Sequence, residues 1–191
     1  MGKRLFLFAA VLFFVLSVAN LSADEGDFGV GADIGGVGLV GNGMSVYGTN
    51  GFGFGGYLTY AASEMFELDL NLIDSPHSAN SNKANALYGT LGLKFGMTFD
   101  QLMPYLTGGV GFYRNAITLN GVSDSAASFG FNFGGGMDID VGKFVRIGLL
   151  VRYHPVFEKN LSSGPTGVND FWDALLRVGF LFRTGIQGGW D

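Results

Sequence analysis

Hydrophobic and polar residues alternate along most of this chain. In KFVRIGLLVRYHPVF (residues 143–157), every second residue from Val145 to Tyr153 is apolar, and the positions between them include two arginines. Successive side chains of a β-strand point to opposite faces, so an alternation of period two predicts a strand. The same alternation recurs along the chain and predicts eight strands, over residues 27–40, 51–62, 64–74, 86–99, 104–116, 128–141, 144–157 and 170–183.

The connections between these strands alternate in length. Short connections lie around Ser63 and in DQLMP and VGKF, whereas GNGMSVYGTN, SPHSANSNKANA, LNGVSDSAA and EKNLSSGPTGVN are longer and polar. Short turns on one rim and long loops on the other are typical of outer-membrane barrels, in which the short turns are periplasmic. The strands also approach or exceed the roughly 9–11 residues that a tilted membrane strand needs. No helix of useful length is predicted after residue 23.

The two faces of the strands differ in bulk as well as polarity. One face of residues 128–141 carries Phe129, Phe131 and Phe133, and the other is mostly glycine, asparagine and aspartate. A soluble barrel would have to hold all the bulky side chains in an interior that eight strands make barely wide enough for side chains. The inverted arrangement fits better, with the apolar face toward lipid. The sequence therefore predicts an all-β fold, an eight-stranded antiparallel up-and-down transmembrane β-barrel.

The first residues have the layout of a secretory signal peptide. Lys3 and Arg4 precede an apolar run from residue 5 to 16, and small residues follow. The run is shorter than the roughly 20 residues of a spanning helix, so export and cleavage are favoured over a membrane anchor. We expect a signal peptide at 1–23, cleaved after Ala19 or Ala23, and a barrel domain at 24–191.

Charge and composition narrow the possible functions. The chain has 11 basic and 16 acidic residues, and two of the basic ones lie in the expected signal peptide, which leaves a mature net charge of about −7. This acidity opposes nucleic-acid binding, which needs a basic surface. The chain has no cysteine, which excludes a disulfide framework and a lipoprotein anchor.

Charged residues gather on the face that is predicted to line the lumen. We expect a structural charge network there, because an enclosed charge needs a partner. Its predicted members are Asp33, Glu67, Asp69, Lys94, Asp138, Asp140, Arg146, Arg152, Asp173 and Arg177, with Arg183 as a further basic residue. The expected order of the strands places Lys94 beside Glu67 and Asp69, and Arg177 beside Asp33, so we expect ion pairs between these residues. A plug is favoured over an ion or solute path, because eight strands leave almost no lumen.

No motif predicts a catalytic, cofactor or metal site. GVGLVG (residues 36–41) matches a dinucleotide fingerprint, but the residues after it cannot begin the required helix. His77 and Ser78 are adjacent in a predicted polar loop that would fix neither of them. His154 can meet Asp173 across a strand pair, but no serine has a clear place beside it. Two histidines without cysteine also make a transition-metal site unfavourable.

Two segments carry a resemblance to a known family. PYLTGGVGFYRNA (104–116) and FGFNFGGGMDIDVGKFVRIGLLVRYHPVF (129–157) resemble the small outer-membrane β-barrel family, which includes the transmembrane domain of outer membrane protein A and outer membrane protein X. The resemblance implies eight antiparallel strands in the outer membrane of a Gram-negative cell, and no single activity. The sequence departs from the family at RTGIQGGWD, where a terminal aromatic residue is usual, and it ends at residue 191 without a peptidoglycan-binding domain.

These observations predict a structural or adhesin-like protein, not an enzyme, that acts through four surface loops. The expected partners are outer-membrane lipid and lipopolysaccharide, the barrel-assembly machinery during biogenesis, and an unknown surface ligand; the protein is expected to be a monomer. The alternative is a narrow channel or carrier for small hydrophobic or ionic solutes. A lipid A-modifying enzyme is the third interpretation.

Overall fold

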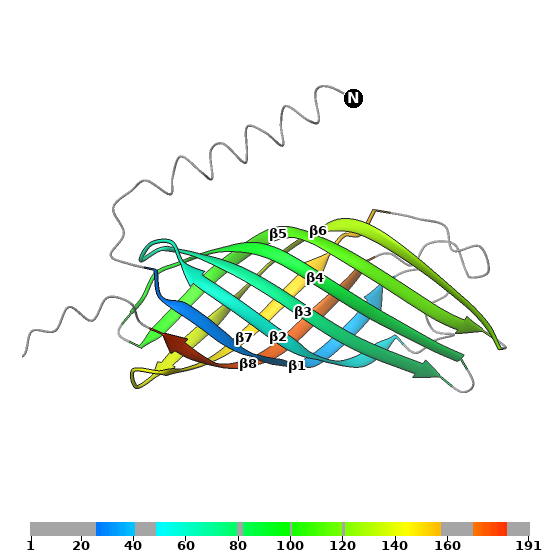
Figure 1. Cartoon of the computed structure of the whole chain (residues 1–191), viewed down its shortest axis with the longest axis horizontal. Helices are drawn as coiled ribbons and strands as arrows, with labels where there is room; N and C mark the ends of the chain where they lie inside the picture. The colour runs from blue at the N-terminus through cyan, green and yellow to red at the C-terminus, as the bar shows by residue number, and fades with distance from the viewer. Residues whose placement is uncertain are drawn as a thin grey trace, which may run out of the picture.

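The computed structural model describes residues 26–40, 49–79, 82–99, 101–119, 121–157 and 170–182. Each strand pairs antiparallel with the next and β8 pairs with β1, so the sheet closes into a barrel (Figure 1). The predicted eight-stranded antiparallel barrel is confirmed. Its strands are β1 (Phe28–Val40), β2 (Asn50–Ala61), β3 (Phe66–Ala79), β4 (Asn82–Gly96), β5 (Leu102–Leu119), β6 (Val122–Val141), β7 (Val145–His154) and β8 (Asp170–Phe182).

The three short connections lie together at one rim, on the left of Figure 1, where β1 also begins and β8 ends. In the β2–β3 turn, the Ser63 hydroxyl oxygen accepts hydrogen bonds from the backbone N–H groups of Met65 (3.3 Å) and Phe66 (3.1 Å). In the β6–β7 turn, Gly142 has φ of +71°, a conformation that glycine adopts without steric cost. Local turn chemistry thus explains why the chain reverses at these points. We call this end the short-turn rim.

Two hairpins extend much further than predicted. The strands β3 and β4 continue to Ala79 and from Asn82, through most of the segment that was predicted as a polar loop. Proline has no backbone N–H to donate to a neighbouring strand, so within a sheet it is tolerated where the strand is an edge. Pro76 lies in such a place, because β3 pairs with β2 only as far as Asp74 and beyond it pairs with β4 alone.

The β5–β6 hairpin shows the same difference. These strands contain 18 and 20 residues and run to Leu119 and from Val122, again through a predicted loop. The serines and alanines of this segment lack the bulk that marks a membrane strand, yet the ladder between the two strands continues in one register to the turn. Two of the four predicted surface loops are therefore mostly strand.

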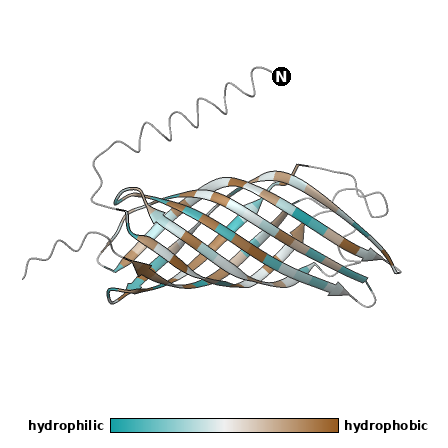
Figure 2. Ribbon diagram, viewed as in Figure 1, coloured by the Kyte–Doolittle hydropathy of each residue, from teal (hydrophilic) through white to brown (hydrophobic). Residues whose placement is uncertain are grey.

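The alternation of faces agrees with the prediction. Leu149 is 56% exposed on the outer surface, whereas the adjacent Leu150 is 1% exposed inside the barrel. Figure 2 shows hydrophobic and hydrophilic positions alternating along the strands. The outer surface is therefore the apolar one, as a bilayer requires.

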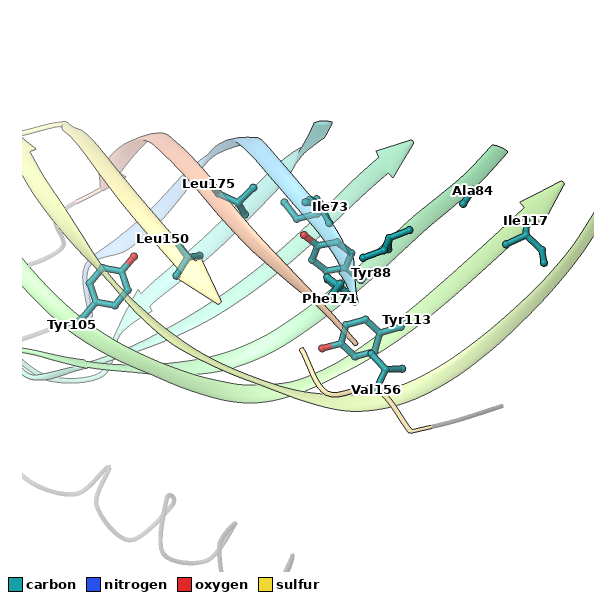
Figure 3. Packing of buried hydrophobic residues seen from close by; sticks show 12 residues of the cluster. Ile73, Ala84, Tyr88, Tyr105, Tyr113, Ile117, Leu150, Val156, Phe171 and Leu175 are labelled. Carbon is teal, nitrogen blue, oxygen red and sulfur yellow. The ribbon is translucent and has the colours of Figure 1, made fainter. Parts of the chain in front are cut away.

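The interior is filled by side chains along its length. In Figure 3, Tyr105, Leu150, Leu175, Tyr88 and Ile117 succeed one another inside the barrel, from near the short-turn rim toward the ends of the long hairpins. All five are at most 5% exposed. An eight-stranded barrel has an interior of about this capacity, so it encloses a packed core.

Some sequence predictions fall on residues that the structure does not describe. The expected signal peptide at 1–23, both candidate cleavage sites, Arg183, the connections at 41–48 and 158–169, and the segment after residue 182 lie outside the described residues. In the described part of the chain, no helix has the length and apolar character to cross a membrane.

Candidate functional site

All ten predicted network residues point into the barrel. They come from six strands, β1, β3, β4, β6, β7 and β8. Asp140 and Arg146, nearest the short-turn rim, are half-buried, and the other eight are between 0% and 7% exposed. The structure arranges them in successive clusters along the lumen.

Lys94 is the centre of the first cluster. Its Nζ lies 2.9 Å from Glu67 Oε1, 3.3 Å from Asp69 Oδ2 and 3.0 Å from Asp138 Oδ2. The Tyr105 ring covers the same ammonium group, with its centroid 4.5 Å from Nζ. Glu67 is directly opposite Lys94 in the β3–β4 register, as predicted, whereas Asp138 reaches it from β6, beyond β5. Three carboxylates and an aromatic face therefore surround one buried cation.

Arg146 completes this cluster at the short-turn rim. Its Nε lies 2.7 Å from Asp140 Oδ1, its partner across the β6–β7 register. Its Nη1 lies 2.7 Å from Glu67 Oε2, on the opposite side of the lumen. Arg146 thereby joins β7 to β3, two strands that share no backbone ladder.

Arg177 forms the second cluster, in the middle of the barrel. Its Nε donates to Asp33 Oδ1 at 3.0 Å, and its Nη1 donates to Asp69 Oδ2 at 2.5 Å. The guanidinium carbon lies 3.9 Å from the centroid of the Tyr57 ring. Ion pairing and a cation–π contact together compensate for the removal of this charge from water.

Arg152 and Asp173 form the third cluster, toward the long hairpins. Arg152 Nε and Nη2 donate to the two oxygens of Asp173 at 3.2 and 2.7 Å, the bidentate geometry that arginine and carboxylate favour. Arg152 Nη1 also donates to the Thr90 hydroxyl at 3.0 Å. Asp173 is directly opposite Arg152 in the β7–β8 register.

His154 extends the third cluster through a chain of hydrogen bonds. Its Nε2 lies 3.1 Å from Asp173 Oδ2, and its Nδ1 lies 3.0 Å from the Tyr113 hydroxyl. A carboxylate only accepts, so Nε2 carries the proton that faces Asp173. The Tyr88 hydroxyl donates to the same carboxylate at 2.9 Å. Phe171 stacks on the imidazole with the ring centroids 4.3 Å apart.

Glycine makes room for these groups. A Cβ added at Gly148 would collide with the Asp138 carboxylate, and one at Gly179 would collide with the Tyr57 hydroxyl. The inward glycines of the sequence therefore have a steric role, since they leave space for the charged and aromatic side chains of other strands.

A polar cavity of about 410 Å³ lies at the short-turn rim. Its lining includes Glu64 and Gln101 from the turns and reaches Lys94, Tyr105 and Arg146 of the first cluster. The Arg177 and Arg152 clusters do not line it. The cavity therefore reaches the network and contacts only its first cluster.

The groups considered for catalysis are arranged differently from the prediction. His77 is not in a loop: it lies on β3, 3% exposed, with Nε2 3.1 Å from the Ser75 hydroxyl. Ser78 is exposed on the opposite face, so the two adjacent residues do not form a pair. His154 does meet Asp173, but the hydroxyl beside it belongs to Tyr113, and all three side chains are buried.

The other candidate motifs also lack the geometry of a binding site. Residues 36–40 of the glycine fingerprint lie in β1, an extended strand, where no helix N-terminus can receive a phosphate. Among the described residues, no group of three or more histidine, aspartate or glutamate side chains is arranged to hold a metal ion.

The sequence analysis missed the aromatic layer around His154. Tyr88, Tyr113 and Phe171 are each at most 2% exposed, and Phe171 lies 4.8 Å and 5.4 Å from the two tyrosine rings. Their inward parity could have been taken from the alternation. These uncharged side chains need no counter-charge, so the search for charge pairs did not identify them.

No curated protein matches this chain, but solved structures share its fold. Neisserial surface protein A is 16% identical, with a TM-score of 0.66, over 83% of this chain and 99% of its own. The N-terminal β-barrel domain of Pseudomonas aeruginosa OprF is 17% identical, with a TM-score of 0.58, over 83% and 100%. Ail, the attachment invasion locus protein of Yersinia pestis, is 15% identical, with a TM-score of 0.56, over 84% and 100%. At these identities the likeness shows the fold alone.

The family comparison covers most of the sequence. The model of the outer membrane protein beta-barrel domain matches residues 7–183. Its barrel architecture agrees with the closed eight-stranded sheet and with the apolar outer surface. The chain therefore belongs to the outer membrane protein beta-barrel domain family.

Proposed function

We propose that the protein is an outer-membrane barrel with a sealed interior, and that it acts as a structural or adhesin-like protein through its long hairpins and loops. The observation that carries this proposal is the enclosure of Arg177. This side chain is 1% exposed, and its partners Asp33 and Asp69 are 0% and 3% exposed. Charges that line a water-filled path are hydrated, whereas these charges are neutralised by one another.

The extended hairpins support an interaction outside the membrane. The strands β5 and β6 have 18 and 20 residues, well beyond the roughly 9–11 that cross a bilayer. Their excess length lies at the end opposite the short-turn rim (Figure 1). Ser123 and Ser125, near the turn of this hairpin, are exposed. A polar, hydrogen-bonded hairpin that stands clear of the bilayer offers a surface to an external ligand.

The route to the membrane forms part of the same proposal. A signal peptide at residues 1–23 directs export, the barrel-assembly machinery inserts the mature chain, and outer-membrane lipid and lipopolysaccharide surround it as a monomer. The apolar outer surface supports insertion, because its exposed side chains, such as Leu106 (68%) and Phe180 (60%), suit lipid and not water.

Conductance tests the sealed interior. Refolded protein in a planar bilayer is expected to give no steady ion current, and a large water-filled porin measured in the same cell serves as the positive control. Arg177→Ala together with Asp33→Ala removes part of the seal and serves as an internal comparison. A steady, ion-selective current from the unmodified chain would contradict the sealed interior.

Adherence tests the surface role. Cells that display the full barrel are compared with cells whose β5–β6 hairpin is shortened by removing residues 118–123, beyond the part of the barrel that faces lipid. We expect the shortened protein to assemble but to lose binding to host-cell or matrix surfaces. Equal binding by both would argue against a role for this hairpin.

The cavity at the short-turn rim favours a second function, a narrow channel or carrier. Its 410 Å³ could admit a small solute as far as Lys94 and Arg146. Passage would then require rearrangement of the Arg177 cluster. Substrate-dependent uptake into proteoliposomes, measured beside the planar-bilayer currents, would support this function over the sealed barrel.

A lipid A-modifying enzyme has the least support. The Tyr113–His154–Asp173 chain is the nearest approach to a catalytic arrangement, and its members are enclosed in the core. Mass spectrometry of lipid A from cells with and without the protein is expected to give the same spectrum. A mass shift that disappears with His154→Gln would overturn this view.

A further inference from the structure

The lipid-facing wall of the barrel carries an apolar groove. Its volume is about 550 Å³, and it crosses β3 to β6 on the outer surface. Its lining includes Leu70, Leu91, Val110, Phe112 and Phe131. Gly89 also lines it and contributes no side chain, so the wall is hollow between larger neighbours. A concave apolar surface in contact with a bilayer is suited to an acyl chain.

The groove ends near the outer boundary of the bilayer. On β5 the outward residues from Leu102 to Phe112 are apolar or glycine, and the next outward residue is Arg114. From Leu102 to Arg114 the strand advances roughly 30 Å along the barrel axis, given the usual rise and tilt of membrane strands, which is slightly more than the roughly 25 Å height of the apolar band. Arg114 therefore lies at the level of the lipid headgroups, on the side away from the short-turn rim.

Two outward-facing cations at this end of the barrel have no partner in the described part of the protein. Arg114 and Lys83 are both exposed, and neither makes a hydrogen bond or ion pair with a described residue. Lys83 lies on the neighbouring strand β4, where it faces Thr118 of β5, four residues beyond Arg114 and so about 10 Å further from the membrane. Asp74 lies in the same row of the sheet as Arg114, two strands away, and its carboxylate accepts a hydrogen bond from Asn85 at 2.8 Å.

The position of these two cations is distinctive within this acidic chain. Among the described residues, the other basic side chains are the four inside the lumen and Lys143, which lies in the β6–β7 turn at the opposite rim. Within the described ranges, outward-facing positive charge at this end of the barrel is thus confined to strands that carry the groove. Arginine and lysine at the end of an apolar groove complement a ligand with a phosphate group and a hydrocarbon chain.

We propose that the outer wall of β4–β6 binds a phosphorylated glycolipid of the lipid A class in the external leaflet. One acyl chain occupies the groove beside Gly89, and a phosphate binds Arg114 with support from Lys83. Phe112 lies between the two parts of the site, two positions before Arg114 on the same face of β5. This site is separate from the sealed interior and from the tips of the hairpins. It rests on the outer-membrane placement proposed above and names one lipid class and one wall of the barrel for that contact.

The groove offers a clean test, because it can be filled without disturbing the barrel. A Cβ at Gly89 would meet only the Asn71 carbonyl oxygen at 3.7 Å and Leu72 Cδ1 at 3.8 Å, which are ordinary contacts. Gly89→Leu therefore places a side chain in the groove without a backbone clash. Gly108→Leu is the matched control, since Gly108 also faces outward, its Cβ would meet only the Asn132 carbonyl oxygen at 3.7 Å, and it does not line the groove.

The headgroup contact has a matched pair of variants as well. Arg114→Gln removes the cation at the proposed site, and Lys83→Gln removes the supporting one. Lys143→Gln removes a cation that is also exposed, at the opposite rim. All variants can be checked for folding by the faster gel migration of unheated barrel protein, so a loss of binding is separable from a loss of structure.

Native mass spectrometry of the refolded full barrel in detergent measures the binding. The probes are lipid A, dephosphorylated lipid A and phosphatidylglycerol, titrated separately. We expect Arg114→Gln to weaken lipid A binding by about tenfold, the scale of one charged hydrogen bond. Dephosphorylated lipid A should bind more weakly to the wild type and be insensitive to Arg114→Gln. Gly89→Leu should weaken both forms of lipid A, and the two control variants should bind as the wild type does.

Three results would overturn the proposal. The first is wild-type affinity in both Gly89→Leu and Arg114→Gln. The second is an equal loss in Gly108→Leu or Lys143→Gln, which would indicate a nonspecific apolar or electrostatic effect. The third is equal binding of phosphatidylglycerol and lipid A with the same response to every variant, which would assign the site to anionic lipid in general.

Discussion

Arg177 on β8 donates to Asp69 on β3 across the lumen, with Nη1 2.5 Å from Oδ2. The two strands share no ladder, because β1 and β2 lie between them. The same guanidinium also binds Asp33 on β1. One side chain thus ties together three strands, and its two acidic partners differ in what else they contact. Asp69 lies 3.3 Å from Lys94, whereas Arg177 is the one cation paired with Asp33 among the described residues.

The first prediction follows from this difference. Arg177→Ala should cost about 3–5 kcal/mol of unfolding free energy, because it leaves a buried carboxylate without its counter-charge. Adding Asp33→Ala should recover much of the loss, since it removes that orphan charge. Adding Asp69→Ala should recover less, because it also deprives Lys94 of a partner. Urea titration in lipid vesicles measures all three, and equal recovery by both second changes would contradict the assignment of Asp33 as the dependent partner.

The second prediction concerns two adjacent residues on β7. Leu149 faces lipid and Leu150 faces the packed interior. Leu149→Arg should cost roughly 2–4 kcal/mol near the bilayer midplane, and less in a thinner bilayer where the charge lies closer to water. Leu150→Arg should destabilise the barrel by overpacking and by an unpaired charge, with no dependence on bilayer thickness. Urea titrations in vesicles of two acyl lengths separate the two effects, and identical behaviour would argue against the alternation of faces.

The third prediction concerns topology. A peptide tag placed between Ser78 and Lys83, at the end of the β3–β4 hairpin, should be reached by antibody on intact cells. A tag at Asp100 or Gln101, in a connection of the short-turn rim, should be reached only after the outer membrane is permeabilised. Both proteins should be present at equal levels in the membrane fraction. The reverse pattern would show that the short-turn rim faces outward, and it would also remove the lipid site from the external leaflet.

The fourth prediction tests the steric role of glycine. Gly148→Ala places a methyl group against the Asp138 carboxylate, which is paired with Lys94. We expect a loss of about 1–3 kcal/mol, the usual cost of overpacking a filled interior. Gly108→Ala is the control, since its methyl group points to lipid and meets one atom at 3.7 Å. If Gly108→Ala lost as much stability as Gly148→Ala, the loss would come from the replacement of glycine in the strand backbone and not from crowding in the lumen.

The sequence alone predicted the architecture because the physical signal is local. Alternation identifies each strand, and neighbouring strands share a ladder, so the predicted pairing of Arg177 with Asp33 and of Lys94 with Glu67 follows from adjacency. Contacts across the lumen do not follow from adjacency. The ion pair between Arg146 and Glu67, for example, depends on side-chain length, on the barrel radius and on the relative height of two strands that share no ladder.

The sequence did not predict that β3 and β4 extend through most of the residues between 75 and 86, and the reason is different. Pro76, His77 and their serine and asparagine neighbours have the composition of a loop, and turn residues outweigh a short alternation. In the structure, the ladder of β3 with β4 continues through them in a single register, from Phe66–Phe95 to Ala79–Asn82. The burial of His77 beside Ser75 is a consequence of that register, so the local sequence does not predict it.

The separation of Arg177 and Asp33 by 144 residues has a consequence for how the barrel forms. Asp33 enters with the first strand and has no cation of its own until the last strand arrives. Neutralisation of Asp33 and closure of the β1–β8 seam are therefore one event. Contacts between such distant segments are slow to form, because chain entropy is lost before they contribute. Insertion should thus be limited by a late, all-or-none step at this seam, and a chain that lacks β8 should stall as an open sheet with an unneutralised acidic interior.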